Sequence, residues 1–475
     1  MEQDYGFDIF LMEQWGGQEE TGSEQCRHAT LRALQKRLKD SDVAAPGTIR
    51  AWCGIGKRSE PGRDKMYQLA FALHLTHKEL EQYLVEGLRM PGVQVNDYRE
   101  IIFYYGLEHQ LSPEECEDMI LVFEKHMCQS YVPLQETHTK RLWKFYEDWR
   151  GLDPVHFLKK MCTHAEMFKG YSKTTLDYFI RLKSELLQYI QEDVKAGMKE
   201  DLEQLGYKQW LAEREIADGD DKEQIKRFLK NISRRMEVRV NASAKELIRS
   251  VRRDCSIVYA EHGRNRDLLR ELYAPVVQQR NGKNIFYKKT SGNLEKDSIP
   301  YMSECHISDL LRISLQKERE IRIAQALAYL KEKTEQEVCP EWICAYLDKL
   351  INEGHTASDE TAPTQTLMTV GEAKAVLEKN HLLQKKRCLL IQRDDLLPLL
   401  LEVSGRKYKK EQETLGQKPD RKEAKEQFRR MANTVLADCS MACLNERYAL
   451  DRLLLDSFME SDVEGFADLI DDQSC

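Results

Sequence analysis

The chain has 475 residues, of which 32% are charged and 41% hydrophobic, and its formal net charge is −8. A chain of this length can bury several cores, so we expect two to four domains. Its overall acidity excludes a protein that coats nucleic acid along its whole length. The longest aliphatic run, at residues 396–401, contains Pro398 and is too short to cross a bilayer, so we expect no membrane partner.

The cysteines and the N-terminus predict a cytoplasmic location. Thirteen cysteines are scattered along the chain, without the dense spacing of a disulfide framework. The N-terminal segment is acidic and apolar, and it lacks the basic start of a signal peptide. We therefore expect free thiols in a reducing compartment.

The segment 46–83 carries the clearest local pattern in the chain. A short helix with Ile49 and Trp52 on one face is predicted to stop at a pair of glycines, since glycine disfavours helix. A basic loop and a helix with regular apolar spacing follow. Thr76 lies three residues before Glu79, the spacing of a capping box, which predicts the start of another helix.

This succession resembles the C-terminal half of a Cro/phage-repressor-type (Xre-like) helix-turn-helix domain over residues 30–84. The resemblance implies a recognition helix at 48–52, a preceding helix at 30–39 and binding to double-stranded DNA. Such modules occur in bacterial regulators, so it also implies a bacterial origin. The residues that it implies at phosphates are Arg50, Lys57, Arg58 and Arg63, with Thr48 and Arg50 nearest the groove.

The local charge around this module is basic although the chain is acidic. Residues 26–65 contain ten Lys or Arg residues against four acids, a local charge of +6. This asymmetry favours an anionic partner, and a solvated basic face is the alternative. Two further helices are predicted at 97–108 and 116–127, and they close a first domain at residue 130.

A second basic stretch lies in the middle of the chain. Between residues 224 and 289, seventeen Lys or Arg residues oppose six acids, and the interleaved apolar residues keep helical spacing. This stretch either binds an anionic partner or neutralises acidic parts of the same chain. At its end, a turn at Asn281-Gly282 and a strand over 284–289 are predicted.

We predict an all-α, multi-domain protein in which helix exceeds half of the residues. The segments 217–221 and 354–366 are polar and aperiodic, which is typical of linkers. The predicted domains are 1–130 (helix-turn-helix-like with an added helical pair), 131–216 (helical), 222–352 (basic and helical) and 367–475 (helical with an acidic end).

No motif of an enzyme or a metal site is complete in the sequence. The glycine-rich phosphate loops, the paired-histidine zinc motif and the nucleophile elbow are missing. Cysteine and histidine occur only as pairs such as Cys439 and Cys443, which are more typical of buried thiols on one helical turn. We therefore expect no catalytic residue, no cofactor and no metal.

The predicted function is a DNA-binding transcriptional regulator of the helix-turn-helix type. The alternative is a helical protein-interaction scaffold whose helix-turn-helix-like module no longer reads DNA. Pro46 and Gly47 favour this alternative, because neither side chain can make a bidentate contact with a base edge. Double-stranded DNA is the expected partner of the regulator, and another protein or a second copy of the chain is the expected partner of the scaffold.

Overall fold

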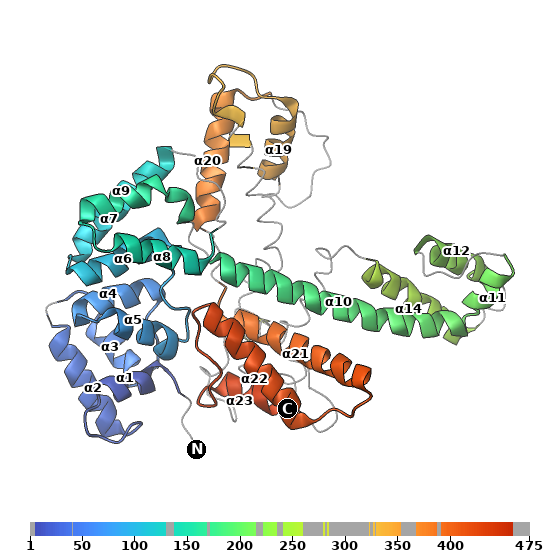
Figure 1. The fold of residues 1–475 in the computed structure, drawn as a ribbon, viewed down its shortest axis with the longest axis horizontal. Helices are drawn as coiled ribbons and strands as arrows, with labels where there is room; N and C mark the ends of the chain where they lie inside the picture. Colours follow the sequence, from blue (N-terminus) through green and yellow to red (C-terminus); the bar gives the residue numbers. More distant parts are fainter. Residues whose placement is uncertain are drawn as a thin grey trace. The chain divides into compact units, whose positions relative to one another are not determined.

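The chain is all-α in the computed structural model (Figure 1). Helices make up well over half of the described residues, as the sequence predicts. Among these residues no helix is both long enough and apolar enough to span a bilayer. The described residues are 5–39, 41–129, 137–168, 172–214, 222–234, 241–259, 279–280, 283–284, 323, 326–327, 329–352, 367–386 and 391–458.

The chain divides into two compact units, each made of segments that are not consecutive. The first contains Met1–Tyr178, Tyr287–Leu397 and Arg429–Asp456, and the second contains the remainder. The four predicted domains are consecutive in sequence, and their boundaries stay a prediction. In the first unit, one continuous core runs from Tyr5 to Phe168, across the boundary expected at residue 130.

The first unit begins with short helices whose ends are set by local sequence. Ser23 caps the second helix by accepting a hydrogen bond from the Cys26 amide. Thr76 and Glu79 form the predicted capping box at the fifth. The elements are α1 (Phe7–Trp15), α2 (Glu24–Arg37), α3 (Pro46–Trp52), α4 (Arg63–Leu73), α5 (His77–Gln82) and the π-helical turn η1 (Tyr83–Gly87).

Four further helices continue this core. Asp97 and Asp153 cap two of them through their carboxylates, and Ser112 caps a third by accepting from the Glu115 amide. The elements are α6 (Tyr98–His109), α7 (Pro113–Gln129), α8 (Thr139–Trp149), α9 (Pro154–Thr163) and the 3-10 turn η2 (Ala165–Met167). The five side chains predicted to be buried together all belong to this core: Ile49, Trp52, Leu69, Leu73 and Leu80.

The first unit also contains a small second core and the segment 429–456. The helices α19 (Glu341–Asn352) and α20 (Val370–Lys386) form the second core, which includes Ile343 and Leu377. The short helix α23 (Ala449–Asp456) belongs to the segment 429–456. Asp451 of α23 forms an ion pair with Arg393 of the same unit, and their Nη2–Oδ2 distance is 2.5 Å.

The second unit is built on long helices, three of which contribute residues to both units. These are α10 (Lys173–Gln204), α21 (Arg393–Leu415) and α22 (Arg421–Asp438). The shorter helices of the second unit are α11 (Tyr207–Ala212), α12 (Lys222–Ile232) and α14 (Ala242–Val258). Its two-residue strands, β1 (Gln279–Arg280) and β2 (Lys283–Asn284), pair antiparallel on either side of the predicted Asn281-Gly282 turn.

Several predicted segments lie outside the described residues. They are most of the strand expected at 284–289, the linkers 217–221 and 354–366, and the acidic end of the chain after residue 458.

Candidate nucleic-acid interface

Helices α2 and α3 form a pair joined by the connection 38–45. They pack through Leu31 and Leu34 of α2 and through the aliphatic and aromatic side chains of α3. The first helix starts at Glu24, earlier than the expected residue 30, because Ser23 supplies the N-cap. The structure thus contains two consecutive helices in the region of the expected pair, and the helix-turn-helix assignment stays a prediction.

Helix α3 directs its apolar side chains inward and its polar side chains to solvent. Ile49 and Trp52 are 5% and 2% exposed. Thr48 and Arg50 lie on the exposed side, next to the equally exposed Pro46. Thr48 and Arg50 are therefore the side chains of this helix that can donate hydrogen bonds to a partner.

Lys57 is exposed in the loop that follows α3. The loop turns at Gly54 and Gly56, whose φ angles of 70° and 87° favour glycine. A Cβ atom at Gly54 would also lie 1.9 Å from an Arg27 nitrogen, so a larger residue does not fit there. The turn thus presents Lys57 at the surface beside the end of α3.

Arg58 takes part in an ion-pair network inside the module. Its Nε lies 3.3 Å from Oδ2 of Asp8, whose side chain is 6% exposed. Arg27 donates to the same carboxylate at 2.7 Å and to the Gly54 carbonyl at 3.1 Å. Burial, together with the negative charge of Asp8, raises the pKa of the Cys53 thiol to about 12. The network fixes the turn after α3 to helices α1 and α2, so Arg58 has a structural contact in addition to any contact with a partner.

Arg63 lies inside the module, at the start of α4. Its guanidinium makes two hydrogen bonds to Glu100, of 2.5 and 2.7 Å, and donates to the carbonyls of Pro91 and Gly92. Burial disfavours the charged form, but the Glu100 carboxylate outweighs it and raises the pKa of Arg63. With its side chain 12% exposed, Arg63 holds the segment 91–92 against α4 and α6, and its guanidinium donates to these acceptors. The phosphate contact expected of Arg63 stays a prediction.

The carboxylates around Arg63 give the module a pH-dependent element. Burial, followed by repulsion from Glu100, raises the pKa of Asp97 to about 6. Asp97 also caps α6 by accepting from the amides of Arg99 and Glu100. The folded chain therefore binds a proton at Asp97 in a pH range where the unfolded chain has released it.

We expect Asp97→Asn to change the pH dependence of stability. The raised pKa stabilises the fold at low pH, and this advantage is lost as the pH rises from about 4 to about 6. Asparagine keeps the cap without titrating. The free energy of unfolding of the variant, measured by urea titration, should thus increase relative to the native chain across that range.

Asp153→Asn is the matched control for this substitution. Asp153 caps α9 in the same way, but its hydrogen bond with His156 lowers its pKa. A carboxylate with a lowered pKa stabilises the fold at high pH, so the control should change the slope with the opposite sign. Equal slopes in the two variants would contradict the burial of Asp97.

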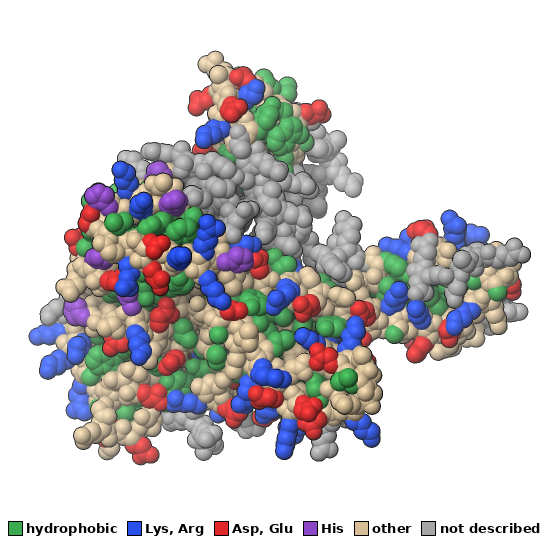
Figure 2. Space-filling model, viewed as in Figure 1, with side chains coloured by type: hydrophobic (Ala, Val, Ile, Leu, Met, Phe, Trp, Pro, Cys, Tyr) green, Lys and Arg blue, Asp and Glu red, His purple; other side chains and the backbone are tan. Residues whose placement is uncertain are grey.

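Helix α2 adds exposed basic residues, which contribute to the local positive charge of residues 26–65 and were not predicted as site residues. Figure 2 shows Lys and Arg side chains gathered along the edge where Figure 1 places α2. Arg37 lies 5.3 Å from the ring centre of Trp15. In the part of the chain that the structure describes, Arg50 and Lys57 have no ion-pair partner, and neither do the basic residues at the exposed end of α2. These are Arg32, Lys36, Arg37 and Lys39.

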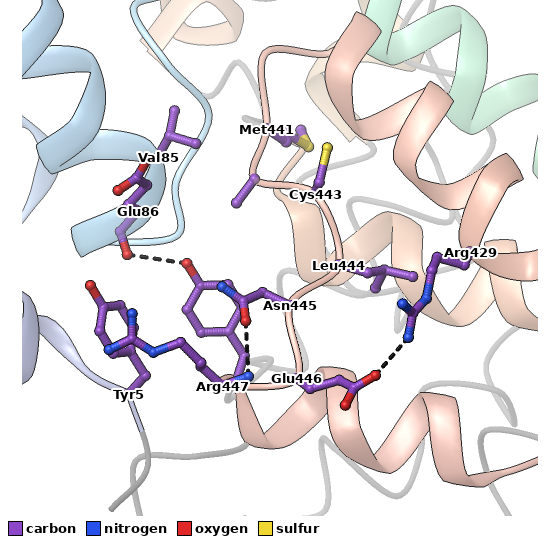
Figure 3. Close-up of a pocket in the computed structure, with 12 residues that line it drawn as sticks. Tyr5, Val85, Glu86, Arg429, Met441, Cys443, Leu444, Asn445, Glu446 and Arg447 are labelled. Carbon is purple, nitrogen blue, oxygen red and sulfur yellow. Dashed lines mark hydrogen bonds and ion pairs between the residues drawn. The ribbon is translucent and has the colours of Figure 1, made fainter. Parts of the chain in front are cut away.

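A cavity of about 680 Å³ lies between η1 and the segment 441–448 of the same unit (Figure 3). Three of its charged side chains are in ion pairs, Arg429 with Glu446 at 2.6 Å and Arg447 with Glu13. Cys443 contributes an exposed thiol. No cluster of three His, Cys, Asp or Glu side chains that could hold a metal is found among the described residues. The cavity is also lined by the exposed Glu86.

Comparison of the chain with protein-family models, with curated proteins and with solved structures finds no match.

Proposed function

We propose that the helices α1 to α5 form a DNA-binding module of the helix-turn-helix type and that the chain is a transcriptional regulator. The observation that carries the proposal is the exposed basic surface on and beside α3, where Arg50 and Lys57 have no ion-pair partner among the described residues. Unpaired cations on a short exposed helix favour contact with phosphates, because each contact releases condensed counterions.

The four arginine and lysine residues named by the resemblance divide into two groups. Arg50 and Lys57 are exposed, and we assign them to DNA phosphates. Arg58 and Arg63 contact Asp8 and Glu100, which supports a role in holding α3 and α4 in place. The basic residues of α2 supply further phosphate contacts.

Reading of bases rests on few side chains in this proposal. Thr48 and Arg50 are the polar residues of α3 that face solvent, and the exposed Pro46 and Gly47 offer no side-chain donor. We therefore expect phosphate contacts to supply most of the affinity and base contacts to supply little of it.

The test is the salt dependence of duplex binding by the full chain. We expect the combined variant Arg50→Ala/Lys57→Ala to bind a fluorescent mixed-sequence duplex more weakly. The slope of log affinity against log salt should become shallower by about 2, since each lost phosphate contact removes about 0.9. Fluorescence anisotropy between about 50 and 200 mM salt measures both quantities.

The matched control is Lys407→Ala/Lys409→Ala, which removes two exposed cations of α21 and changes the net charge by the same amount. If the control lowers the slope as much as the α3 variant does, binding follows net charge and the module is not the site.

A scaffold of protein interactions is the second candidate. It is favoured by Leu121 and Val122 of α7, which are 61% and 54% exposed. Neighbouring exposed aliphatic residues are typical of contact surfaces. Failure of the full chain to bind any duplex at low salt would favour this candidate over the regulator.

A further inference from the structure

The second basic stretch of the sequence folds, in part, into a small helical subdomain of the second unit. The end of α10 packs with α11, α12 and α14 around one apolar core. Phe228 of α12 and Val251 of α14 are 1% and 0% exposed. The Sγ atom of Cys255 in α14 lies 3.6 Å from the Sδ atom of Met198 in α10, so the two helices are in contact. The apolar faces of both basic helices are thus used within the fold.

The outer faces of α12 and α14 carry two rows of cations. Residues four apart lie on one side of a helix and about 6 Å apart along its axis. Lys226 and Lys230 follow this spacing on α12, Arg234 continues it in the turn after the helix, and Lys245, Arg249 and Arg253 follow it on α14. All six are exposed, and Figure 2 shows Lys and Arg side chains over this subdomain.

Helix α14 approaches the end of α12 at one point. Arg252 of α14 donates to the Ser233 hydroxyl at 3.4 Å. Ser233 directly precedes Arg234, the last cation of the α12 row. Across 222–234 and 241–259 there are nine Lys or Arg residues and three acids. Glu223 pairs with Lys226 and Asp254 with Arg253, so two of the three acids each have a basic neighbour. The exposed cations of the two helices and of the turn after α12 are here called the α12–α14 surface: Lys226, Arg227, Lys230, Arg234, Lys245, Arg249, Arg252 and Arg253.

Two acids of α10 in the same unit have basic partners outside this surface. Glu192 of α10 pairs with Lys410 at 2.7 Å, and the adjacent Asp193 pairs with Arg406, both on α21. Among the described residues no ion-pair partner exists for four cations of the surface, namely Arg227, Lys230, Lys245 and Arg249. The intramolecular role that the sequence left open is thus not carried out by these neighbouring carboxylates.

We propose that the α12–α14 surface is a second, sequence-independent binding site for the phosphate backbone of duplex DNA. A duplex presents one charge per about 1.7 Å of its axis, which is dense enough to neutralise both rows. Tyr207, Trp210 and Phe228 of the subdomain are buried, which disfavours the stacking of bases that single strands use. A lipid surface is disfavoured because the apolar faces are already packed.

The site goes beyond the proposed function and does not depend on it. A second phosphate-binding surface in the same chain would raise the overall affinity for DNA without adding sequence information. It would also steepen the dependence of binding on salt.

The experiment uses the full chain and removes the four cations that have no ion-pair partner among the described residues. We expect Arg227→Ala/Lys230→Ala/Lys245→Ala/Arg249→Ala to lower affinity for a fluorescent mixed-sequence duplex at least about tenfold at low salt. The log–log salt slope should become shallower by about 3 to 4. The four positions are solvent-exposed, and circular dichroism checks that the helices persist.

The control removes four exposed lysines outside the surface, Lys407, Lys409, Lys418 and Lys422, again by alanine. The slope of log affinity against log salt decides the outcome. If it becomes shallower by the same amount in both fourfold variants, or changes in neither, the α12–α14 surface is not a DNA site. Loss of retention on immobilised polyglutamate with unchanged duplex binding would also overturn it, in favour of an acidic protein.

Combining this variant with Arg50→Ala/Lys57→Ala separates the two proposals. Independent sites predict that the losses in slope add. An effect of the α12–α14 variant alone would uphold the second site and reject the module, and an effect of the α3 variant alone would do the reverse.

Discussion

Replacing Asp451 by alanine should cost about 3–5 kcal/mol of unfolding free energy, because it leaves the Arg393 guanidinium buried without its counter-charge. The two side chains are 0% and 1% exposed and share two hydrogen bonds. Arg393 also donates to the carbonyls of Ala442 and Cys443, so it fixes the segment that precedes α23. Urea titration followed by circular dichroism measures the loss.

Two variants accompany Asp451→Ala. Glu446→Ala breaks the exposed pair with Arg429 and should cost at most about 1 kcal/mol, since exposed pairs contribute little. The double substitution Arg393→Met/Asp451→Leu removes both charges and should recover much of the loss. An Asp451→Ala cost as small as that of Glu446→Ala would mean that water reaches Arg393.

The local features of this fold could be predicted from the sequence. The capping boxes at Thr76 and Thr369 need only a hydroxyl and a carboxylate three residues apart, and both are formed. The burial of Ile49 and Trp52 follows from apolar spacing along one short helix. Patterns of this kind lie within a few residues, so they can be recognised without knowledge of the rest of the chain.

The roles of the basic residues near α3 depend on contacts distant in sequence. Arg58 meets Asp8 and Arg63 meets Glu100, and neither carboxylate stands at a spacing that a local pattern identifies. An exposed lysine such as Lys57 and a buried arginine look alike in a count of charges. The sequence therefore indicated a basic module but could not separate the cations available to a partner from those that hold the fold.

For the same reason, the segments that form each of the two units could not be predicted from the sequence. Arg393 joins Asp451 across 58 residues, and α10, α21 and α22 each serve both units. Linkers in a sequence mark places where the chain leaves one helix for another. They do not show which helices, distant in sequence, then pack together.

Trp52→Ala is the substitution that should most weaken the N-terminal module. Its indole is 2% exposed and packs in the core that joins α3 to α2 and α4. Truncating a buried aromatic side chain removes its apolar contacts and leaves a cavity, so the expected cost is about 3–5 kcal/mol. Urea titration monitored by circular dichroism measures it, and because α3 would lose its anchor, duplex binding should weaken as well.

The exposed Trp342 of α19 provides the matched control for this last substitution. It is 49% exposed, so Trp342→Ala should cost less than about 1 kcal/mol and leave duplex binding unchanged. Trp52→Phe keeps most of the apolar volume and should fall between the two alanine variants. Duplex binding is measured at a temperature at which the variant is folded. If Trp52→Ala destabilises the chain and duplex binding stays the same, α3 does not hold the DNA. The basic residues of α2 or the α12–α14 surface must then account for the binding.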